Sequence, residues 1–247
     1  MRHDDRAPHQ LRPCTLEPGF IPRALGSVLV CTGATRVICT ASLEDRPPPW
    51  LRHGGWVTAE YAMLPGATTP RGRRDPGGRG KEIQRLVGRS LRASVDLGKL
   101  VGPEGEALSL VCDCDVIEAD GGTRTASITG GYVALRLALL RLLAQGRLAS
   151  DPLIAPVAAV SVGLLSGIDG GAPYAVLDLD YVEDSSAVVD LNVVALRGDG
   201  PSMGLVEVQG TGEHGTFDRK QLDAMLDLAE LGIAALHAKQ REVIDAA

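Results

Sequence analysis

The sequence predicts an α+β protein made of two lobes. Strand-forming runs are followed by long stretches of helical periodicity twice along the 247-residue chain, and Asp151-Pro152 marks the boundary between the two series. With 45% hydrophobic and 23% charged residues, the composition is that of a soluble globular protein able to bury a good core. We expect one lobe over residues 1–150 and a second, tightly packed one over residues 151–247.

The first lobe is expected to open with an antiparallel hairpin. Two β-rich runs within Ser27–Glu44 flank the turn at Thr32-Gly33-Ala34. A loop rich in proline and glycine follows, and Val57–Leu64 then forms another short strand. Apolar residues recur at helical spacing over Glu82–Lys99, so this stretch is expected to be a helix.

The central stretch Cys112–Gly131 has the pattern of a strand, a glycine turn and the start of a helix. Asp113–Ile117 alternates like a strand, Gly121-Gly122 breaks it, and helical spacing predicts a helix over Ser127–Gln145. The free N–H groups and the dipole of a helix start favour a bound phosphate or carboxylate, to which Thr123 and Arg124 add side-chain donors. The alternative interpretation is an ordinary turn with a threonine cap.

A basic segment without apolar periodicity lies between Pro65 and Lys81. Only Asp75 offsets its cations, which are Arg71, Arg73, Arg74, Arg79 and Lys81. The segment is either a solvated surface loop or a contact with a phosphodiester backbone, and its length favours the second. Arg79 stands just before the expected helix, where a cation is disfavoured by the helix dipole, so we expect it to face an anion.

The second lobe is expected to contain four strands and a final helix. The final helix covers about Phe217–Ile244, with Thr216 as its cap. The strands are expected at Val157–Leu165, Ala175–Asp180, Ala187–Leu196 and Gly204–Gln209.

A group of carboxylates lies among apolar residues in this half. On a strand, Asp178 and Asp180 would share a face, and a turn at Glu183–Ser186 would bring Asp184 beside them, with Asp190 following. Carboxylates without cysteine or histidine suit Mg²⁺ or Mn²⁺. The alternative is a polar turn beside one solvated sheet face.

Composition limits the classes of function. The net charge of −6 argues against a protein that coats nucleic acid, and the five cysteines lack CxxC pairs, so we expect reduced thiols. The N-terminus has no apolar core of a signal peptide, and arginines interrupt the apolar stretch Tyr132–Leu143, so we expect a cytoplasmic protein without a membrane span. The five histidines lack metal-ligand spacing. An anion pocket, a carboxylate metal site and a basic loop together fit phosphoryl transfer.

Long segments of the chain resemble bacterial ribonuclease PH, a family of phosphate-dependent 3′-to-5′ exoribonucleases. They run nearly from end to end: MRHDDRAPHQLRP, CTASLEDRPPPWL, WVTAEYAMLP, KEIQRLVGRSLRA, CDCDVIEADGGTRTASITGG, LDLDYVEDSSAVVDLNVV and VEVQGTGEHGTF. The resemblance implies a fold like domain 2 of ribosomal protein S5, followed by a smaller C-terminal lobe. It also implies a homohexamer, a trimer of dimers.

The resemblance further implies roles for individual residues. Inorganic phosphate, the co-substrate, would bind Arg79 and the turn Gly122, Thr123 and Arg124. Asp178 and Asp184 would serve catalysis and hold Mg²⁺ or Mn²⁺, and Arg71, Arg73 and Arg74 would hold RNA. The family trims nucleotides beyond the CCA end of tRNA precursors, releases nucleoside diphosphates and runs the reverse addition; a further role in rRNA processing or degradation stays open.

Two positions depart from the family pattern. Asp5 replaces a glycine of the opening motif, and Gly66 stands where members often have an arginine, which bears on tRNA affinity more than on catalysis. Two other functions remain as alternatives: a catalytically silent RNA-binding ring subunit, and a hydrolytic nuclease that uses the aspartates and a metal alone.

Overall fold

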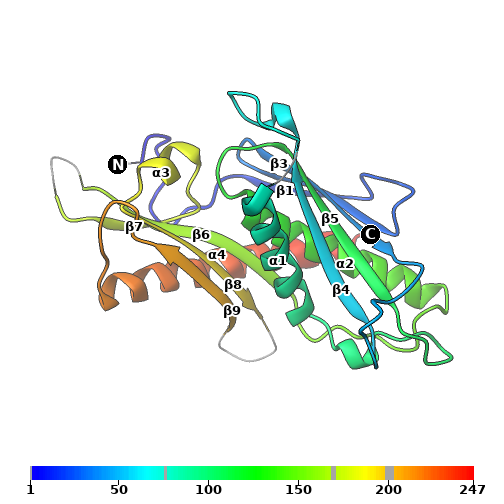
Figure 1. The fold of residues 1–247 in the computed structure, drawn as a ribbon. Coiled ribbons are helices and arrows are strands. Elements are labelled where there is room, and N and C mark those ends of the chain that lie inside the picture. Colours follow the sequence, from blue (N-terminus) through cyan, green and yellow to red (C-terminus); the bar gives the residue numbers. More distant parts are fainter. Residues whose placement is uncertain (1, 75–76, 168–170, 198–202) are drawn as a thin grey trace.

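The computed structural model describes residues 2–74, 77–167, 171–197 and 203–247. In this part of the chain two β-sheets alternate with helices in four layers (Figure 1). The five-stranded sheet packs on two helices, those helices pack on one face of the four-stranded sheet, and a long C-terminal helix covers its other face. The predicted α+β class is confirmed.

The first sheet has the strand order β1-β2-β3-β5-β4. Strands β2 and β3 pair antiparallel around the turn at residues 33–34, which confirms the predicted hairpin. Short 3₁₀ helices at Pro65–Ala67 and Leu97–Lys99 lie in its connections. The strands are β1 (Cys14–Pro18), β2 (Gly26–Thr32), β3 (Thr35–Leu43), β4 (Trp56–Met63) and β5 (Ser109–Glu118).

Strands β4 and β5 are parallel neighbours and are connected through helix α1 (Gly77–Ala93). Parallel strands end at the same edge of a sheet. The arginine-rich segment that leaves β4 and the glycine turn that leaves β5 therefore start side by side, and the N–H of Ala119 donates to the carbonyl of Ala67 at 3.0 Å.

Helix α2 (Thr123–Ala144) lies between the two sheets. It is long and apolar enough to cross a membrane, but 72% of its apolar window is buried within the protein, as in the core helix of a soluble protein. Gly130 allows the close approach to β2: an added Cβ would collide with the side chain of Val30 and lie 3.0 Å from Cys39 Sγ.

The second sheet has the order β7-β6-β8-β9, and all its pairs are antiparallel. Strand β6 is buried on both faces, because α2 packs on one and α4 on the other. This explains why its sequence is almost continuously apolar. The elements are β6 (Val157–Leu165), β7 (Tyr174–Leu177), α3 (Tyr181–Ser186), β8 (Val189–Leu196), β9 (Gly204–Thr211) and α4 (Arg219–Asp245).

Several predicted boundaries are wrong. Helix α1 begins at Gly77, before the expected Glu82, and ends at Ala93; α2 begins at Thr123, before the expected Ser127. The cap of α4 is Asp218, which exchanges capping hydrogen bonds with Gln221, so Thr216 is not the cap. The division into two domains at residues 150 and 151 stays a prediction.

Candidate active site

The glycine turn after β5 exposes the start of α2. Gly122, the residue before the helix, has a left-handed φ of 66°, and no side chain caps the helix N-terminus. The first N–H groups of a helix have no partner within it, so the turn of Thr123, Arg124 and Thr125 presents donors and the positive end of the dipole. This supports the predicted anion site over an ordinary threonine-capped turn.

Tyr61 fixes the orientation of Thr123. Its hydroxyl lies 2.9 Å from Thr123 Oγ1, which it reaches from the neighbouring parallel strand β4. Burial raises the pKa of Tyr61, so the phenol stays protonated at neutral pH. Tyr61 lay within a predicted strand, but no local sequence pattern connected it with the anion turn.

Arg124 is held over a cavity by a residue from the other lobe. Its Nη1 donates to Gln209 Oε1 in β9 at 3.1 Å and lies 4.0 Å from Glu82 Oε1, while Gln209 in turn donates to Glu82 at 2.8 Å. The side chain of Arg124 is 18% exposed. These contacts orient the guanidinium and leave further donors for an anion.

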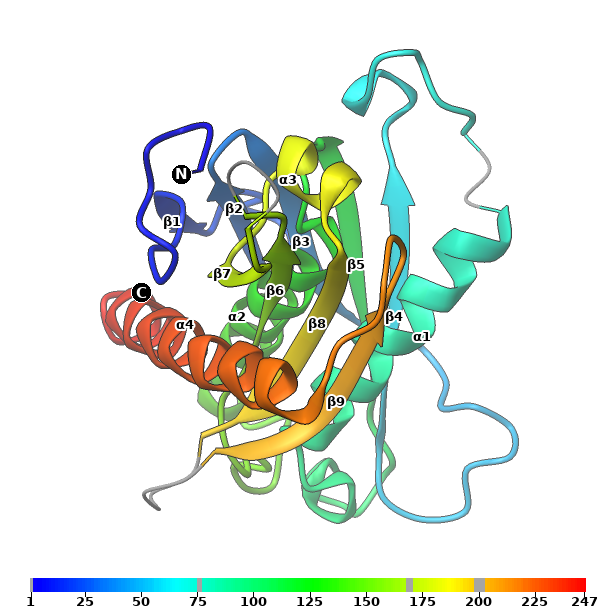
Figure 2. The same ribbon diagram turned by 90° about the vertical axis from the view of Figure 1, so that its left-hand side faces the viewer.

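The cavity has a volume of about 630 Å³ and is formed by five elements. Residues of α1, α2, α3, β8 and β9 line it, together with Glu213 from the segment after β9. Figure 2 shows how these elements are arranged. It brings together the predicted Arg79, Arg124 and Asp184. The lining residues are Arg79, Glu82, Arg124, Tyr181, Asp184, Ser185, Asp190, Asn192, Gln209, Gly210, Thr211 and Glu213.

Two aspartates of this cavity have perturbed acidity. Burial, with the charge of Glu213, raises the pKa of Asp184. Burial and the charge of Asp184 raise the pKa of Asp190 to about 6. Asp190 Oδ2 accepts a long hydrogen bond of 3.5 Å from Asn192, while Oδ1 is buried without a hydrogen-bond partner among the described residues.

The lining charges fit a divalent cation together with an anion. Two arginines, Arg79 and Arg124, face four carboxylates, those of Glu82, Asp184, Asp190 and Glu213. The described residues contain no group of three protein ligands for a metal. Mg²⁺ commonly uses one or two carboxylates, waters and a substrate phosphate, so Asp184 and the unpartnered oxygen of Asp190 suffice.

The backbone around Asp178 corrects the predicted arrangement of the aspartates. Strand β7 ends at Leu177, Asp178 has a left-handed φ of 57°, and Asp180 caps α3, so Asp178 and Asp180 do not share a strand face. Both carboxylate oxygens of Asp178 accept hydrogen bonds from Arg12, at 2.7 and 3.2 Å. Asp178 does not line the cavity that contains Asp184; Asp190 does. A metal site shared by Asp178 and Asp184 stays a prediction.

The predicted RNA-binding arginines lie on an exposed segment after β4. Arg71, Arg73 and Arg74 are exposed, and none of them forms an ion pair with another described residue. Asp75, which was expected to offset them, lies outside the described residues. Arg79 is exposed in the first turn of α1 rather than before it, and this turn contains no acidic residue. Its position at a helix start beside the cavity agrees with the expected anion contact.

Comparison with known proteins identifies the family. The model of domain 1 of the 3′ exoribonuclease family matches residues 10–140, and that of domain 2 matches residues 155–231. The chain belongs to the 3′ exoribonuclease family. The predicted resemblance is therefore confirmed, and the two matched regions meet at the cavity, since Arg79 and Arg124 come from the first and Asp184 and Asp190 from the second.

Relatives within the 3′ exoribonuclease family match over the whole chain. Ribonuclease PH of Bacillus subtilis is 51% identical over 253 residues, covering 99% of this chain and 97% of the relative. Ribonuclease PH of Crocosphaera subtropica is 51% identical over 251 residues, covering 100% and 98%. Near-complete coverage on both sides shows that the likeness includes both lobes.

Solved structures share the fold. Rice (Oryza sativa) Rrp46 has a TM-score of 0.75 at 17% identity, with 98% of this chain and 100% of that chain covered. The Archaeoglobus fulgidus exosome with RNA bound to the active site has a TM-score of 0.75 at 25% identity, with 96% and 92% covered. The likeness to Rrp46, at 17% identity, shows a shared fold and nothing more.

Proposed function

We propose that the cavity between α2 and α3 is where inorganic phosphate attacks the 3′-terminal phosphodiester of RNA. The protein is a phosphorolytic 3′-to-5′ exoribonuclease of tRNA processing, as its family and its full-length relatives named ribonuclease PH support. The observation that carries the site assignment is the uncapped N-terminus of α2, where Thr123 and Arg124 lie beside a cavity that also contains Asp184 and Asp190.

The chemistry requires no side chain as a strong base. Hydrogen phosphate carries an ionised oxygen that attacks the phosphorus of the last nucleotide, and the bond from that phosphorus to the preceding 3′ oxygen breaks. The proton of hydrogen phosphate balances the charge on the leaving 3′ oxygen. The products are a nucleoside diphosphate and an RNA shortened by one nucleotide, and the same groups would support the reverse addition. The protein's contribution is to hold both phosphates in line.

Three groups are proposed to bind the attacking phosphate. The N–H groups of the first turn of α2 and the Thr123 hydroxyl donate hydrogen bonds, while Arg124 and Arg79 supply positive charge. Tyr61 keeps the Thr123 hydroxyl in place. Such preorganised donors act more strongly in a partly buried cavity than in water.

Mg²⁺, or Mn²⁺ in its place, is proposed to bind Asp184 and Asp190. When bound, the ion offsets the charge on the phosphate oxygens. The unpartnered oxygen of Asp190 and the excess of carboxylates support this assignment. From the family resemblance, Asp178 is also proposed to take part in catalysis and in holding the metal.

The finer features of the function are also proposals. We propose that Arg71, Arg73 and Arg74 hold the RNA strand while nucleotides beyond the CCA end of tRNA precursors enter the cavity. We further propose, from the family resemblance, a cytoplasmic homohexamer built as a trimer of dimers. Light scattering coupled to size-exclusion chromatography measures that assembly directly.

Digestion of a tRNA with a short 3′ extension tests the function. The reaction is run with Mg²⁺, with and without inorganic phosphate, and the released nucleotides are identified by chromatography. We expect nucleoside diphosphates, formed only when phosphate is present. Monophosphates released without phosphate would establish a hydrolase instead, and RNA binding without release would identify a silent ring subunit.

A further inference from the structure

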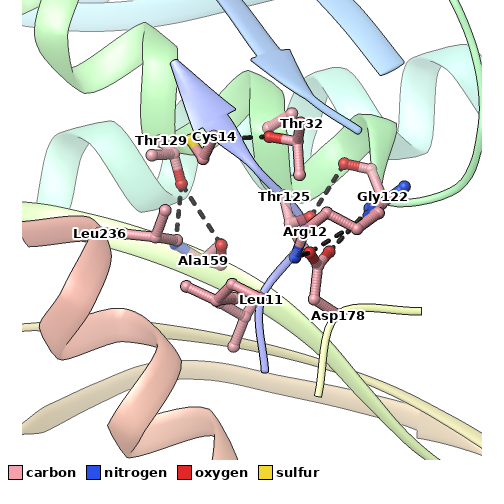
Figure 3. Close-up of a pocket in the computed structure, with 12 residues that line it drawn as sticks. Leu11, Arg12, Cys14, Thr32, Gly122, Thr125, Thr129, Ala159, Asp178 and Leu236 are labelled. Carbon is pink, nitrogen blue, oxygen red and sulfur yellow. Dashed lines mark hydrogen bonds and ion pairs between the residues drawn. The ribbon is translucent and has the colours of Figure 1, made fainter. Parts of the chain in front are cut away.

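The turn that begins α2 is closely packed, whereas the side chain of Arg124 faces a large cavity. Gly122 and Thr125 line a cavity of only about 20 Å³ beside Arg12 (Figure 3), and Thr125 Oγ1 donates to the carbonyl of Gly122 at 2.9 Å. Arg124 instead lines the cavity of about 630 Å³. An arginine side chain has many rotamers, so the place of this guanidinium depends on the side chains that contact it.

Gln209 in β9 connects the guanidinium of Arg124 to Glu82 in α1. Its Oε1 accepts a hydrogen bond from Arg124 Nη1 at 3.1 Å, and its Nε2 donates one to Glu82 Oε1 at 2.8 Å. Arg124 Nη1 and Glu82 Oε1 are 4.0 Å apart, which is too far for a hydrogen bond. The amide therefore stands between a cation and a carboxylate and contacts both.

An amide fits between a cation and a carboxylate because its oxygen accepts hydrogen bonds and its nitrogen donates them. A glutamate at position 209 would accept from Arg124 but repel Glu82. An apolar side chain of the same length would bind neither group, and Glu82 could then approach Arg124. A carboxylate that pairs directly with an arginine offsets its charge, whereas the neutral Gln209 leaves that charge available for an anion.

The register of β8 and β9 places Gln209 beside the carboxylates of the same cavity. Gln209 lies directly opposite Asn192, and Thr211 lies opposite Asp190. Asn192 Nδ2 in turn donates to Asp190 Oδ2 at 3.5 Å. All four residues line the cavity, so one pair of strands carries both the partner of Arg124 and the proposed metal ligand Asp190.

We propose that Gln209 is a positioning residue that keeps Glu82 from pairing with Arg124 and so presents the charge of Arg124 to the attacking phosphate. This inference rests on the proposed function, since it concerns the same phosphate site. Gln209 acts through Arg124 and does not itself contact the phosphate. It gives the second lobe a part in binding an anion whose other proposed ligands all come from the first lobe.

Gln209→Glu is the first test, because it adds a charge at position 209 and keeps the size of the side chain. The new carboxylate would form a charge-assisted hydrogen bond with Arg124. We expect inorganic phosphate to bind about 10–100-fold more weakly, as for the loss of a hydrogen bond to a charged group. Equilibrium dialysis with radiolabelled phosphate measures the affinity without turnover. In phosphorolysis, the KM for phosphate should rise by the same factor while the KM for RNA stays near its wild-type value.

Gln84→Glu is the matched control. Gln84 lies on α1, two residues after Glu82, and lines a different groove together with Arg85 and Arg89. The same change from amide to carboxylate adds the same charge near the site, but it does not place that charge beside Arg124. Phosphate affinity in Gln84→Glu should therefore stay near the wild-type value.

Gln209→Met tests the separation of Arg124 from Glu82. Methionine has a similar length but no amide, so Glu82 should pair with Arg124 directly. We expect phosphate to bind about 2–5-fold more weakly, the effect of a partly exposed ion pair. Adding Glu82→Gln removes the competing charge, and the double variant should regain at least wild-type affinity. A variant that only loosened the packing around Gln209 would not be rescued in this way.

Three results would overturn the inference. They are wild-type phosphate affinity in folded Gln209→Glu, an equal loss of affinity in Gln84→Glu, and weaker binding in Gln209→Met that Glu82→Gln does not restore. If Gln209→Met does not fold, the comparison of Gln209→Glu with Gln84→Glu decides. Failure of the proposed function is read separately, from a wild-type protein that binds no phosphate and releases no nucleoside diphosphate.

Discussion

Asp190 combines a buried carboxylate with an oxygen that no described group satisfies. Its pKa of about 6 arises because burial and the neighbouring Asp184 both disfavour the charged form, and Arg124 offsets this only in part. A site that is unfavourable for an isolated charge is favourable for a charge with a cation beside it. The local instability of the metal-free cavity is thus the physical reason to expect it to bind a metal.

Asp190→Asn is expected to stabilise the metal-free protein above pH 6. The folded pKa is raised above the ordinary 3.8, so the wild type loses stability as pH rises from about 4 to about 6 and stays at the lower level above that. Asparagine does not titrate, and the difference in free energy of unfolding should reach up to about 3 kcal/mol. Urea unfolding with a chelator, at pH 4 and pH 7.5, measures it. Equal stability of the two proteins at pH 7.5 would refute the assigned acidity.

Arg124→Ala is expected to lower phosphate-dependent turnover by about 10²–10³-fold, as for other preorganised groups that stabilise charge. The reason is its position at the N-terminus of α2, oriented by Gln209 toward the cavity. Diphosphate release under saturating RNA measures the rate, and Arg136→Ala, on the same helix outside the cavity, is the control. Turnover near the wild-type value would remove Arg124 from the phosphate site.

At the scale of single residues, the candidate site residues could be predicted from the sequence better than the residues that they contact. Arg79, Thr123, Arg124 and Asp184 were chosen from local patterns and from the family resemblance, and the structure places them around one helix start and one cavity. Asp178 was chosen from alternation and from the family resemblance, but the strand that alternation suggested stops one residue earlier, and a buried arginine 166 positions away pairs with this aspartate. Long-range ion pairs of this kind leave no local signal.

At the scale of elements, helix starts proved hardest to predict. Apolar periodicity locates α1 and α2 but not their first turns, because those turns face the cavity and contain Gly77 and Gly78 in one helix and Thr123 and Arg124 in the other. Helix α3 covers the turn expected at Glu183–Ser186 and begins two residues before it; six residues are too few for periodicity to reveal a helix. The first turns carry Arg79, Thr123 and Arg124, so the poorly predicted boundaries coincide with the proposed phosphate-binding residues; local rules are most often broken at functional sites.

Gly130→Ala and Gly131→Ala form a matched pair that tests the packing of α2. A Cβ at Gly130 would collide with Val30, which is 1% exposed and cannot move aside, whereas at Gly131 the nearest atom is Leu91 Cδ1 at 3.4 Å, an ordinary contact. We expect Gly130→Ala to reduce the free energy of unfolding by about 1–3 kcal/mol. Gly131→Ala should be neutral or more stable by up to about 1 kcal/mol, from helix propensity. Thermal or urea unfolding measures both free energies. Equal changes for Gly130→Ala and Gly131→Ala would contradict the close packing of Gly130 against Val30.

At the scale of the whole molecule, a negatively charged protein binds a negatively charged substrate. The net charge of −6 offers no long-range attraction for RNA, so attraction depends on where the arginines lie. Arg71, Arg73 and Arg74 lie on the segment that leaves β4 and projects beyond the end of the sheet (Figure 2), and Arg79 follows at the edge of the cavity. The same sheet end supplies the anion turn, because β4 and β5 are parallel. The topology therefore places Arg71, Arg73 and Arg74 and the proposed phosphate site at one end of the molecule.

Replacing Arg71, Arg73 and Arg74 with alanine is expected to weaken RNA binding while leaving phosphate binding intact. Each lost phosphate contact releases one fewer counterion, so the slope of log affinity against log salt should become shallower by about 2–3. The control replaces Arg23, Arg46 and Arg219, which are exposed on other parts of the surface and remove the same total charge. If both triple variants change the slope equally, net charge governs the affinity and the arginine segment has no specific role. If only the replacement of Arg71, Arg73 and Arg74 changes the slope, these arginines compensate for the arginine that is missing at Gly66. Gly66→Arg should then make the slope steeper than that of the wild type.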